Sequence, residues 1–248
     1  MNFIKHISHA GVSIFIDGLS ILLDPYSKIE NGIWEDTSWE IAESMILKPA
    51  ADFLIYTHEH LDHFNCDLTI QMLMRHPETK VICGANLQNI LKNAAPEEMN
   101  ISANLLPVQI RKGQIMTIQQ DSVTISLIPT VHDEELLYAT EHYAVLIDGS
   151  KRILALGDTK PVDENFLFLE DSRQPDILVA PFIYLTLRKG RDLVFKNIRP
   201  ETVAFSHLPL LKGDGVLYNE IIQKNYIRLR DQGKSIILLS ESGQSFFI

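Results

Sequence analysis

The segment Thr57-His58-Glu59-His60-Leu61-Asp62-His63 decides how this chain is interpreted, because it places four metal-binding side chains within six residues. His58 and His60 lie two positions apart and can turn toward one ion. Asp62 and His63 follow directly and can reach a second ion nearby. Imidazole nitrogens and carboxylate oxygens suit zinc, iron and manganese. The alternative is a polar surface loop, but the order of the residues favours a metal site.

One loop cannot supply every ligand of two ions, and three later segments offer more. Each is an apolar, strand-like run followed by a histidine or an aspartate. The three are Val123–Pro129 before His132, Arg152–Leu156 before Asp158, and Thr202–Ser206 before His207. Because strands hold loops in place at their ends, these side chains can converge on one edge of a sheet.

With these residues, the chain resembles the metallo-β-lactamase superfamily. The segments that carry the resemblance are Leu23-Asp24-Pro25, His58-x-His60-x-Asp62-His63, His132, Gly157-Asp158-Thr159 and Ser206-His207. Residues 9–16 and 21–25 are similar to the opening of the lactonase-like branch, which contains relatives of ascorbate-phosphate lactonase. The resemblance implies an α/β protein, a four-layer αββα sandwich that forms a single domain over residues 1–248.

The resemblance also implies a ligand set for two divalent ions. His58, His60 and His132 would hold the first ion. The second would be held by Asp62, His63 and His207, and Asp158 would bridge the two ions. We expect zinc, with manganese or iron as alternatives, because the ligands are nitrogen and oxygen without a thiolate.

Three further roles follow from the same resemblance. Asp24 matches the first signature aspartate of the family, which supports the site from behind the ligands and orients an imidazole. His9 lies where the lactonase-like branch tends to carry a histidine, although an ordinary strand histidine is an equal interpretation. Asp62 would coordinate and also orient the nucleophile or move its proton. A divalent ion lowers the pKa of bound water from about 15.7 to near 7, so the implied reaction is hydrolysis by a metal-bridging hydroxide.

The composition is that of an ordinary enzyme domain. The chain has 248 residues, of which 46% are hydrophobic, and its formal net charge is −10. An acidic protein is a poor partner for the nucleic-acid backbone, so we expect no nucleic-acid partner. We expect a small-molecule substrate instead. No apolar run approaches the roughly 18 residues that span a bilayer, and the first residues lack an apolar signal core. We therefore expect a cytoplasmic protein without a membrane partner; the oligomeric state stays open.

The remaining pattern predicts two rounds of strands followed by helices. Asp17-Gly18 indicates a hairpin between strands Val12–Ile16 and Leu19–Leu23. A second hairpin is predicted at the end, with strands Ser235–Ser240 and Gln244–Ile248 around Glu241-Ser242-Gly243. Other expected strands are Val81–Ala85, His142–Asp148 and Asp176–Pro181, and the expected helices are Asp67–Arg75, Val162–Glu170 and a last helix on which Tyr218, Ile221, Ile222, Tyr226 and Leu229 form an apolar face.

The substrate is less well indicated. Arg188, Lys189 and Arg191 follow a strand and could bind a phosphate or carboxylate, and Lys160 lies two residues beyond Asp158. The alternative is a solvated turn. Trp34, Trp39 and Ile41 belong to an insertion at residues 26–50, where they could line a cleft or pack beneath the loop.

Three functions stay open at this stage. The first is a dinuclear hydrolase of a small, optionally anionic, metabolite such as a lactone. The second is a phosphodiesterase acting on a lipid or nucleotide. The third is an iron-dependent redox protein, or a non-catalytic binding domain, on the same scaffold, because fold alone does not determine function.

Overall fold

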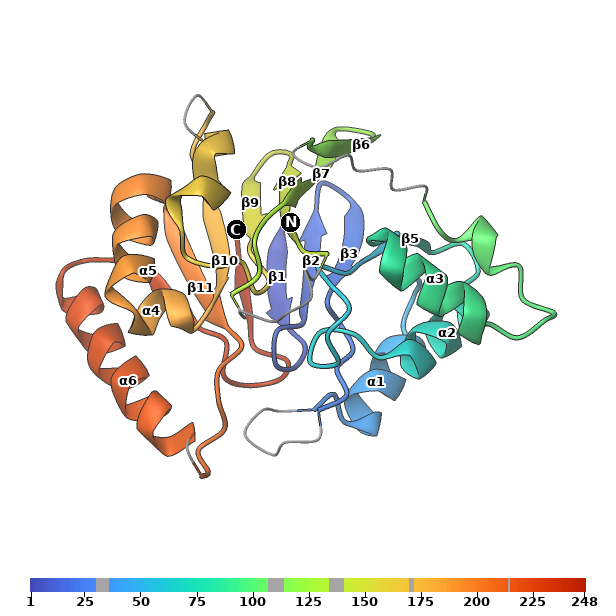
Figure 1. Ribbon diagram of the computed structural model, residues 1–248, viewed down its shortest axis with the longest axis horizontal. Coiled ribbons are helices and arrows are strands. Elements are labelled where there is room, and N and C mark those ends of the chain that lie inside the picture. Colours follow the sequence, from blue (N-terminus) through green and yellow to red (C-terminus); the bar gives the residue numbers. More distant parts are fainter. Residues whose placement is uncertain (30–35, 107–113, 134–140, 170–171, 214) are drawn as a thin grey trace.

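The computed structural model describes residues 1–29, 36–106, 114–133, 141–169, 172–213 and 215–248. Two mixed β-sheets pack face to face, and helices cover the outer face of each sheet (Figure 1). This is the four-layer αββα sandwich expected from the sequence. Apolar side chains fill each of the three interfaces between neighbouring layers.

The first sheet has the strand order β13-β1-β2-β3-β4-β5. Its strands are β1 (Phe3–His6), β2 (Val12–Ile16), β3 (Leu19–Leu23), β4 (Phe53–Ile55), β5 (Lys80–Ile82) and β13 (Ser245–Phe247). The helices on its outer face are α1 (Trp39–Ile46), α2 (Cys66–Arg75) and α3 (Ala85–Ala94), with the short 3-10 helix η1 (Ile101–Ala103) after them. The predicted first hairpin is confirmed, since β2 and β3 pair antiparallel.

The second sheet has the strand order β12-β11-β10-β9-β8-β7-β6. Its strands are β6 (Met116–Gln120), β7 (Val123–Pro129), β8 (Tyr143–Asp148), β9 (Arg152–Ala155), β10 (Ile177–Pro181), β11 (Thr202–Ser206) and β12 (Ile236–Leu238). Its outer face is covered by α4 (Ile183–Thr186), α5 (Arg188–Asp192), the π-helical turn η3 (Leu193–Ile198) and α6 (Gly215–Asp231). The helix expected at Val162–Glu170 is the 3-10 helix η2 (Asp163–Leu169).

Successive side chains along each strand point to opposite faces of its sheet, so alternate residues pack in different layers. Ile14 and Ile21 of the first sheet and Val145 and Ile153 of the second meet in the apolar layer between the sheets. Their neighbours point outward: Leu22 and Leu54 pack against α1–α3, whereas Leu154 and Leu178 pack against the helices of the second half. A strand buried on both faces reads as a continuous apolar run, as Ile153–Leu156 does.

The predicted final hairpin is wrong. β12 pairs in parallel with β11 in the second sheet, whereas β13 pairs antiparallel with β1 in the first sheet. The chain crosses between the sheets at Leu239, which is buried in the layer between them. The turn itself is present, because Gly243 adopts a φ of 86° and its amide donates to the carbonyl of His6. Strand β5 is also shorter than the predicted Val81–Ala85, since Ala85 begins α3.

Candidate metal centre

Six loops meet at one end of the sandwich because the strands that precede them run in the same direction. In the first sheet, β1 and β3 are both antiparallel to β2, and β4 is parallel to β3. In the second sheet, β7 and β9 are both antiparallel to β8, and β11 shares the direction of β9 through β10. The residues that follow these strands are His9, Asp24, the segment 57–63, His132, Asp158 and His207.

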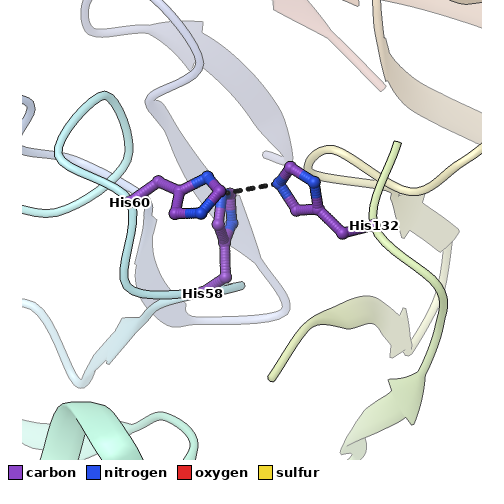
Figure 2. Close-up of side chains that lie close together, drawn as sticks. All are labelled: His58, His60 and His132. Atoms are coloured by element: carbon purple, nitrogen blue, oxygen red, sulfur yellow. Dashed lines mark hydrogen bonds between the residues drawn. The ribbon is translucent and has the colours of Figure 1, made fainter. Parts of the chain in front are cut away.

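The first group of side chains consists of His58, His60 and His132 (Figure 2). His58 and His60 come from the loop after β4, and His132 comes from the other sheet, after β7. The Nε2 atoms of His58 and His132 lie 3.2 Å apart. One nitrogen from each of the three rings lies within 4.8 Å of the others, so the rings converge on a common point.

The second group consists of Asp62, His63, Asp158 and His207. Nε2 of His207 lies 3.1 Å from Asp62 Oδ2 and 3.6 Å from Asp158 Oδ2. Nε2 of His63 lies 3.3 Å from Asp158 Oδ1. Asp158 also faces the first group, since its Oδ2 is 3.8 Å from Nε2 of His132. This carboxylate therefore lies between the two groups.

Asp24 orients two of these imidazoles. Its Oδ2 accepts hydrogen bonds from Nδ1 of His63 at 2.8 Å and from Oγ1 of Thr57 at 2.6 Å, and its Oδ1 accepts the Thr57 amide. Because the Thr57 hydroxyl proton is directed at Asp24, Oγ1 can only accept from Nδ1 of His58, which lies 3.0 Å away. Both histidines thus carry a proton on Nδ1 and present Nε2 to the cluster.

His9 completes the wall of the second group. Its ring packs against the ring of His207 with 3.9 Å between centroids, and its Nε2 lies 3.7 Å from Asp62 Oδ2. The amide of His207 donates to the His9 carbonyl. His9, Asp24 and His207 all have positive φ, between 45° and 57°. Left-handed backbone is uncommon at non-glycine residues, and three of the six such residues in the described part of the chain lie at this site.

His142 lies at the site, although the sequence pattern indicates it only as the start of a strand. It is buried, and its ring centroid lies 4.9 Å from that of His58. Its Nε2 accepts the amide of Asp158 at 3.0 Å, so its proton is on Nδ1, which donates to Oγ1 of Thr130. His142 enters from the beginning of β8, the strand that runs opposite to β7 and β9, and only knowledge of the sheet order could have indicated this.

Asp133 is a second residue of the site that was not predicted from the sequence. Its Oδ1 lies 3.2 Å from Nδ1 of His132, the nitrogen opposite the one that faces His58. Its amide donates to the carbonyl of Asp158. Asp133 is therefore placed to orient His132, as Asp24 orients His63. Its position directly after a predicted ligand is the one signal in the sequence that points to it.

The electrostatics of the site favour positive charge at its centre. Burial alone would raise the pKa of Asp158, but the surrounding imidazoles, His207 and His63 above all, hold it well below its usual range. Burial alone would lower the pKa of His63, yet Asp158, Asp24 and Asp62 raise it well above its ordinary value. Burial lowers the pKa of His58, and lowers that of His132 to about 4, so these two rings are neutral at pH 7 and retain a lone pair.

The residues fit two divalent cations. Nitrogens bound to one tetrahedral ion at about 2.1 Å would lie about 3.4 Å apart, close to the 3.2 Å between His58 and His132. Nε2 of His63 is buried and faces the carboxylates of Asp158 at 3.3 Å and Asp62 at 3.9 Å, an arrangement that suits a cation held between them. The carboxylates of Asp24, Asp62 and Asp158 surround the His63 ring, and their negative charge would compensate the positive charge of bound cations.

The cationic residues considered for substrate binding make local contacts instead. Arg188 pairs with Asp192 and Lys189 with Asp163. Nη1 of Arg191 donates to the carbonyls of Leu185 and Thr186 at the end of α4. The amide of Lys160 donates to the carbonyl of Val131, which precedes His132. A role of these residues in substrate binding stays a prediction.

The insertion at residues 26–50 is described in part. Trp34 lies outside the described residues, and Trp39 begins α1 with 53% of its surface exposed. Ile41 does line a cavity, between α1 and the first sheet. Within the part of the chain that the structure describes, no helix is long and apolar enough to cross a membrane.

Comparison with known proteins agrees with this geometry. Residues 21–207 match the family described as the β-lactamase superfamily domain. A UPF0173 protein of Pyrococcus abyssi (strain GE5 / Orsay) is 30% identical over 206 residues, which is 80% of each chain. The matched range contains all of the clustered side chains except His9.

Two solved structures share the fold. A metallo hydrolase from the hyperthermophilic archaeon Ignicoccus hospitalis KIN4/I superposes with a TM-score of 0.67 at 18% identity, over 100% of this chain and 98% of the other. CmlA, a diiron β-hydroxylase from Streptomyces venezuelae, gives a TM-score of 0.65 at 14% identity. That match covers 100% of this chain and 54% of the hydroxylase.

Proposed function

We propose that this chain, which belongs to the metallo-β-lactamase superfamily, is a metal-dependent hydrolase of a small ester-like metabolite such as a lactone, with two divalent ions in its site. One observation carries the proposal. Two groups of nitrogen and oxygen ligands lie side by side, and the carboxylate of Asp158 faces both. Zinc suits this donor set, with manganese and iron as alternatives.

Each side chain has a defined task in this proposal. His58, His60 and His132 would hold one ion, Asp62, His63 and His207 the other, and Asp158 both. When bound, the ions supply a water of lowered pKa and polarise the carbonyl that is attacked. Asp24, His142 and Asp133 keep the ligands oriented through their hydrogen bonds and ion pairs.

Asp62 is the residue to which we assign proton transfer. Burial alone would raise its pKa, but His63 and the hydrogen bond from His207 hold the pKa far below its usual range. The carboxylate is consequently ionised at neutral pH and able to accept a hydrogen bond from the attacking water. It is also less buried than the histidines around it, so a substrate can approach it.

The surroundings of the ligands support an uncharged or partly apolar substrate. Leu61, between His60 and Asp62, is 56% exposed, and Val131, directly before His132, is 58% exposed. Phe182 packs against the outer side of His207 and contacts Tyr218. These apolar side chains next to the ligands are suited to the carbon skeleton of a lactone.

The test is hydrolysis by metal-loaded protein across one panel of lactones, sugar-phosphate lactones, phosphodiesters, thioesters and β-lactams. We expect turnover of lactones, which Asp62→Ala reduces by about a hundredfold or more, the scale of positioned acid–base catalysis. Lys224→Gln, on the exposed face of α6, is the matched control and should keep full activity. Turnover of phosphodiesters alone would contradict the lactone assignment and favour the phosphodiesterase.

A redox function is the second candidate, because a nitrogen and oxygen donor set also suits iron. Metal analysis of protein purified without added metal separates the two. Zinc or manganese at about two ions per chain would support hydrolysis. Iron at that stoichiometry, with oxygen consumption in the presence of a reductant, would contradict it.

A further inference from the structure

A second cavity lies away from the metal centre, on the outer face of the first sheet. It is bounded by β1, β2 and β3, by α1, and by the turn at Ser242 and Gly243. Its volume is about 140 Å³, which corresponds to on the order of ten water-sized positions. A molecule of a few to about ten non-hydrogen atoms would fit.

Two lysines line this cavity. Lys5 projects from β1 and Lys48 from the segment after α1. Among the described residues, neither forms an ion pair, although Asp52 and Glu241 are close in sequence to the lining. Oδ2 of Asp52 instead accepts the amide of Ser20, and the carbonyl of Glu241 contacts Nδ1 of His6. The cavity therefore has an excess of positive charge.

Both lysines line the same cavity, so the charge of one acts on the other. Burial lowers the pKa of Lys48, and the charge of Lys5 lowers it further. Lys5 is half-buried and Lys48 is exposed at the rim of the cavity, where two like charges repel each other and an anion between them would relieve that repulsion. Their placement therefore indicates a binding site for an anion.

Hydroxyl groups and an apolar floor complete the cavity. Ser13 pairs with Lys5 across β1 and β2, so their side chains are neighbours on the same face. The hydroxyls of Ser13, Ser20 and Ser242 make no hydrogen bond with the described part of the chain, and are available as donors. The floor is formed by five apolar side chains: Ile7, Leu22, Ile41, Met45 and Met72.

We propose that this cavity binds a small amphiphilic anion, whose carboxylate or phosphate head contacts Lys5 and Lys48 and whose short alkyl chain lies on the apolar floor. The two head groups share the chemistry that the lysines and hydroxyls recognise. The site is separate from the catalytic proposal: no ligand of the metal centre lines it. It faces the layer of α1–α3, whereas the metal centre lies at the strand ends.

The experiment is a binding titration followed by amide NMR and calorimetry, with the full chain loaded with metal. The probes are hexanoate, hexyl phosphate, inorganic phosphate and hexylammonium. We expect hexanoate or hexyl phosphate to bind and to shift the amides of Ser13, Ser20 and Gly243. The tighter of the two identifies the natural head group, and hexylammonium should not bind.

Variants assign the site. Lys5→Gln and Lys48→Gln should each weaken binding about tenfold or more, the scale of a charge-assisted hydrogen bond. Lys224→Gln is the control for loss of one surface charge, and Asp62→Ala the control for anion binding at the metals; both should bind as the natural sequence does. Ser13→Leu fills the cavity and should abolish binding in a protein that keeps both lysines.

Three results would overturn the proposal. One is equal binding of hexanoate to the natural sequence and to both lysine variants. Another is loss of binding in Asp62→Ala with the lysine variants unaffected, which would place the anion at the metals. The third is equal affinity for inorganic phosphate and hexyl phosphate, which would remove the role of the apolar floor.

Discussion

Gly157, after β9 of the second sheet, packs directly against Thr57, after β4 of the first sheet. A Cβ atom on residue 157 would lie 2.8 Å from Oγ1 of Thr57 and 2.9 Å from its Cβ. That hydroxyl is hydrogen-bonded to Asp24, so it cannot turn away without loss of the contact. Gly157 also has a φ of 51°, and it directly precedes Asp158. The position of the Asp158 carboxylate, which faces both groups of side chains, thus depends on a residue without a side chain.

Gly157→Ala should therefore damage both folding and metal binding. We expect the free energy of unfolding to fall by about 2–5 kcal/mol, the sum of left-handed strain and overpacking. Urea unfolding and metal content after dialysis measure the two effects. Gly213→Ala is the matched control, because Gly213 has a φ of 53° but nothing within 4 Å of the added Cβ. If both variants lose the same stability, crowding at Thr57 is not the cause.

His142 should affect metal binding by positioning Asp158, whose backbone amide donates to its Nε2. His142→Phe keeps a ring of similar size but leaves the buried amide of Asp158 without its acceptor, at a cost of about 1–3 kcal/mol. We expect metal affinity to fall about 10- to 100-fold, the usual effect of losing a partner that orients ligands. Competition with a chelator measures it. His142→Gln retains an acceptor near the position of Nε2 and should recover most of the affinity; equal loss in both variants would contradict the hydrogen-bond explanation.

The site could be predicted from sequence where the information is local or depends only on strand direction. His58, His60, Asp62 and His63 lie on one short loop, so their order alone indicates their proximity. His132, Asp158 and His207 follow apolar runs, and strands that run in one direction bring their ends together. His142 could not be placed in this way, because it precedes its strand, β8. A residue before a strand reaches this edge of the sheet only if the strand is antiparallel to its neighbours, as β8 is to β7.

The errors have the same origin. The turn at Ser242 and Gly243 can be predicted from the sequence. Both flanking runs are apolar, however, and the neighbouring residues do not indicate which sheet each run joins. β12 continues the parallel series after β11, while β13 closes the open edge at β1. The cations after β10 are not among these errors, because their role in substrate binding stays a prediction, but their placement was equally hard to derive from the sequence. A run of charges does not indicate direction, and Arg191 turns back to the end of α4.

Asp17, which lies in the β2–β3 turn, should make the stability of the folded protein depend on pH independently of the metal centre. Hydrogen bonds from the hydroxyl and amide of Ser150 lower the pKa of this carboxyl, and they join the β2–β3 turn to the β8–β9 turn of the other sheet. A lowered pKa means that the stabilisation is present above about pH 4 and is lost as the pH falls through the folded-state value.

Asp17→Asn should accordingly be less stable than the natural sequence at pH 7, by only about 0.5 kcal/mol because the carboxyl is exposed to solvent. The difference should shrink toward pH 2–3. Urea unfolding of both proteins across this range measures it, and the comparison cancels the acid sensitivity of the metal centre. A difference that grows as the pH falls would have the wrong sign for this contact.

Metal removal should destabilise the whole sandwich, because the ligands come from loops of both sheets. His58 and His132 belong to opposite sheets, as do Asp62 and His207. Ions that bind only the folded chain stabilise it by about 4 kcal/mol at a thousandfold excess over the dissociation constant, which corresponds to about 8–16 °C in Tm for a chain of this size. Thermal unfolding before and after treatment with a chelator measures the shift, and added metal should restore it in a concentration-dependent way. In His63→Ala, which lacks a ligand of the second group, the chelator should lower the Tm by less. If the natural sequence loses its metal completely and keeps its Tm, the ions do not link the two sheets, and the strand-end loops are held by protein contacts alone.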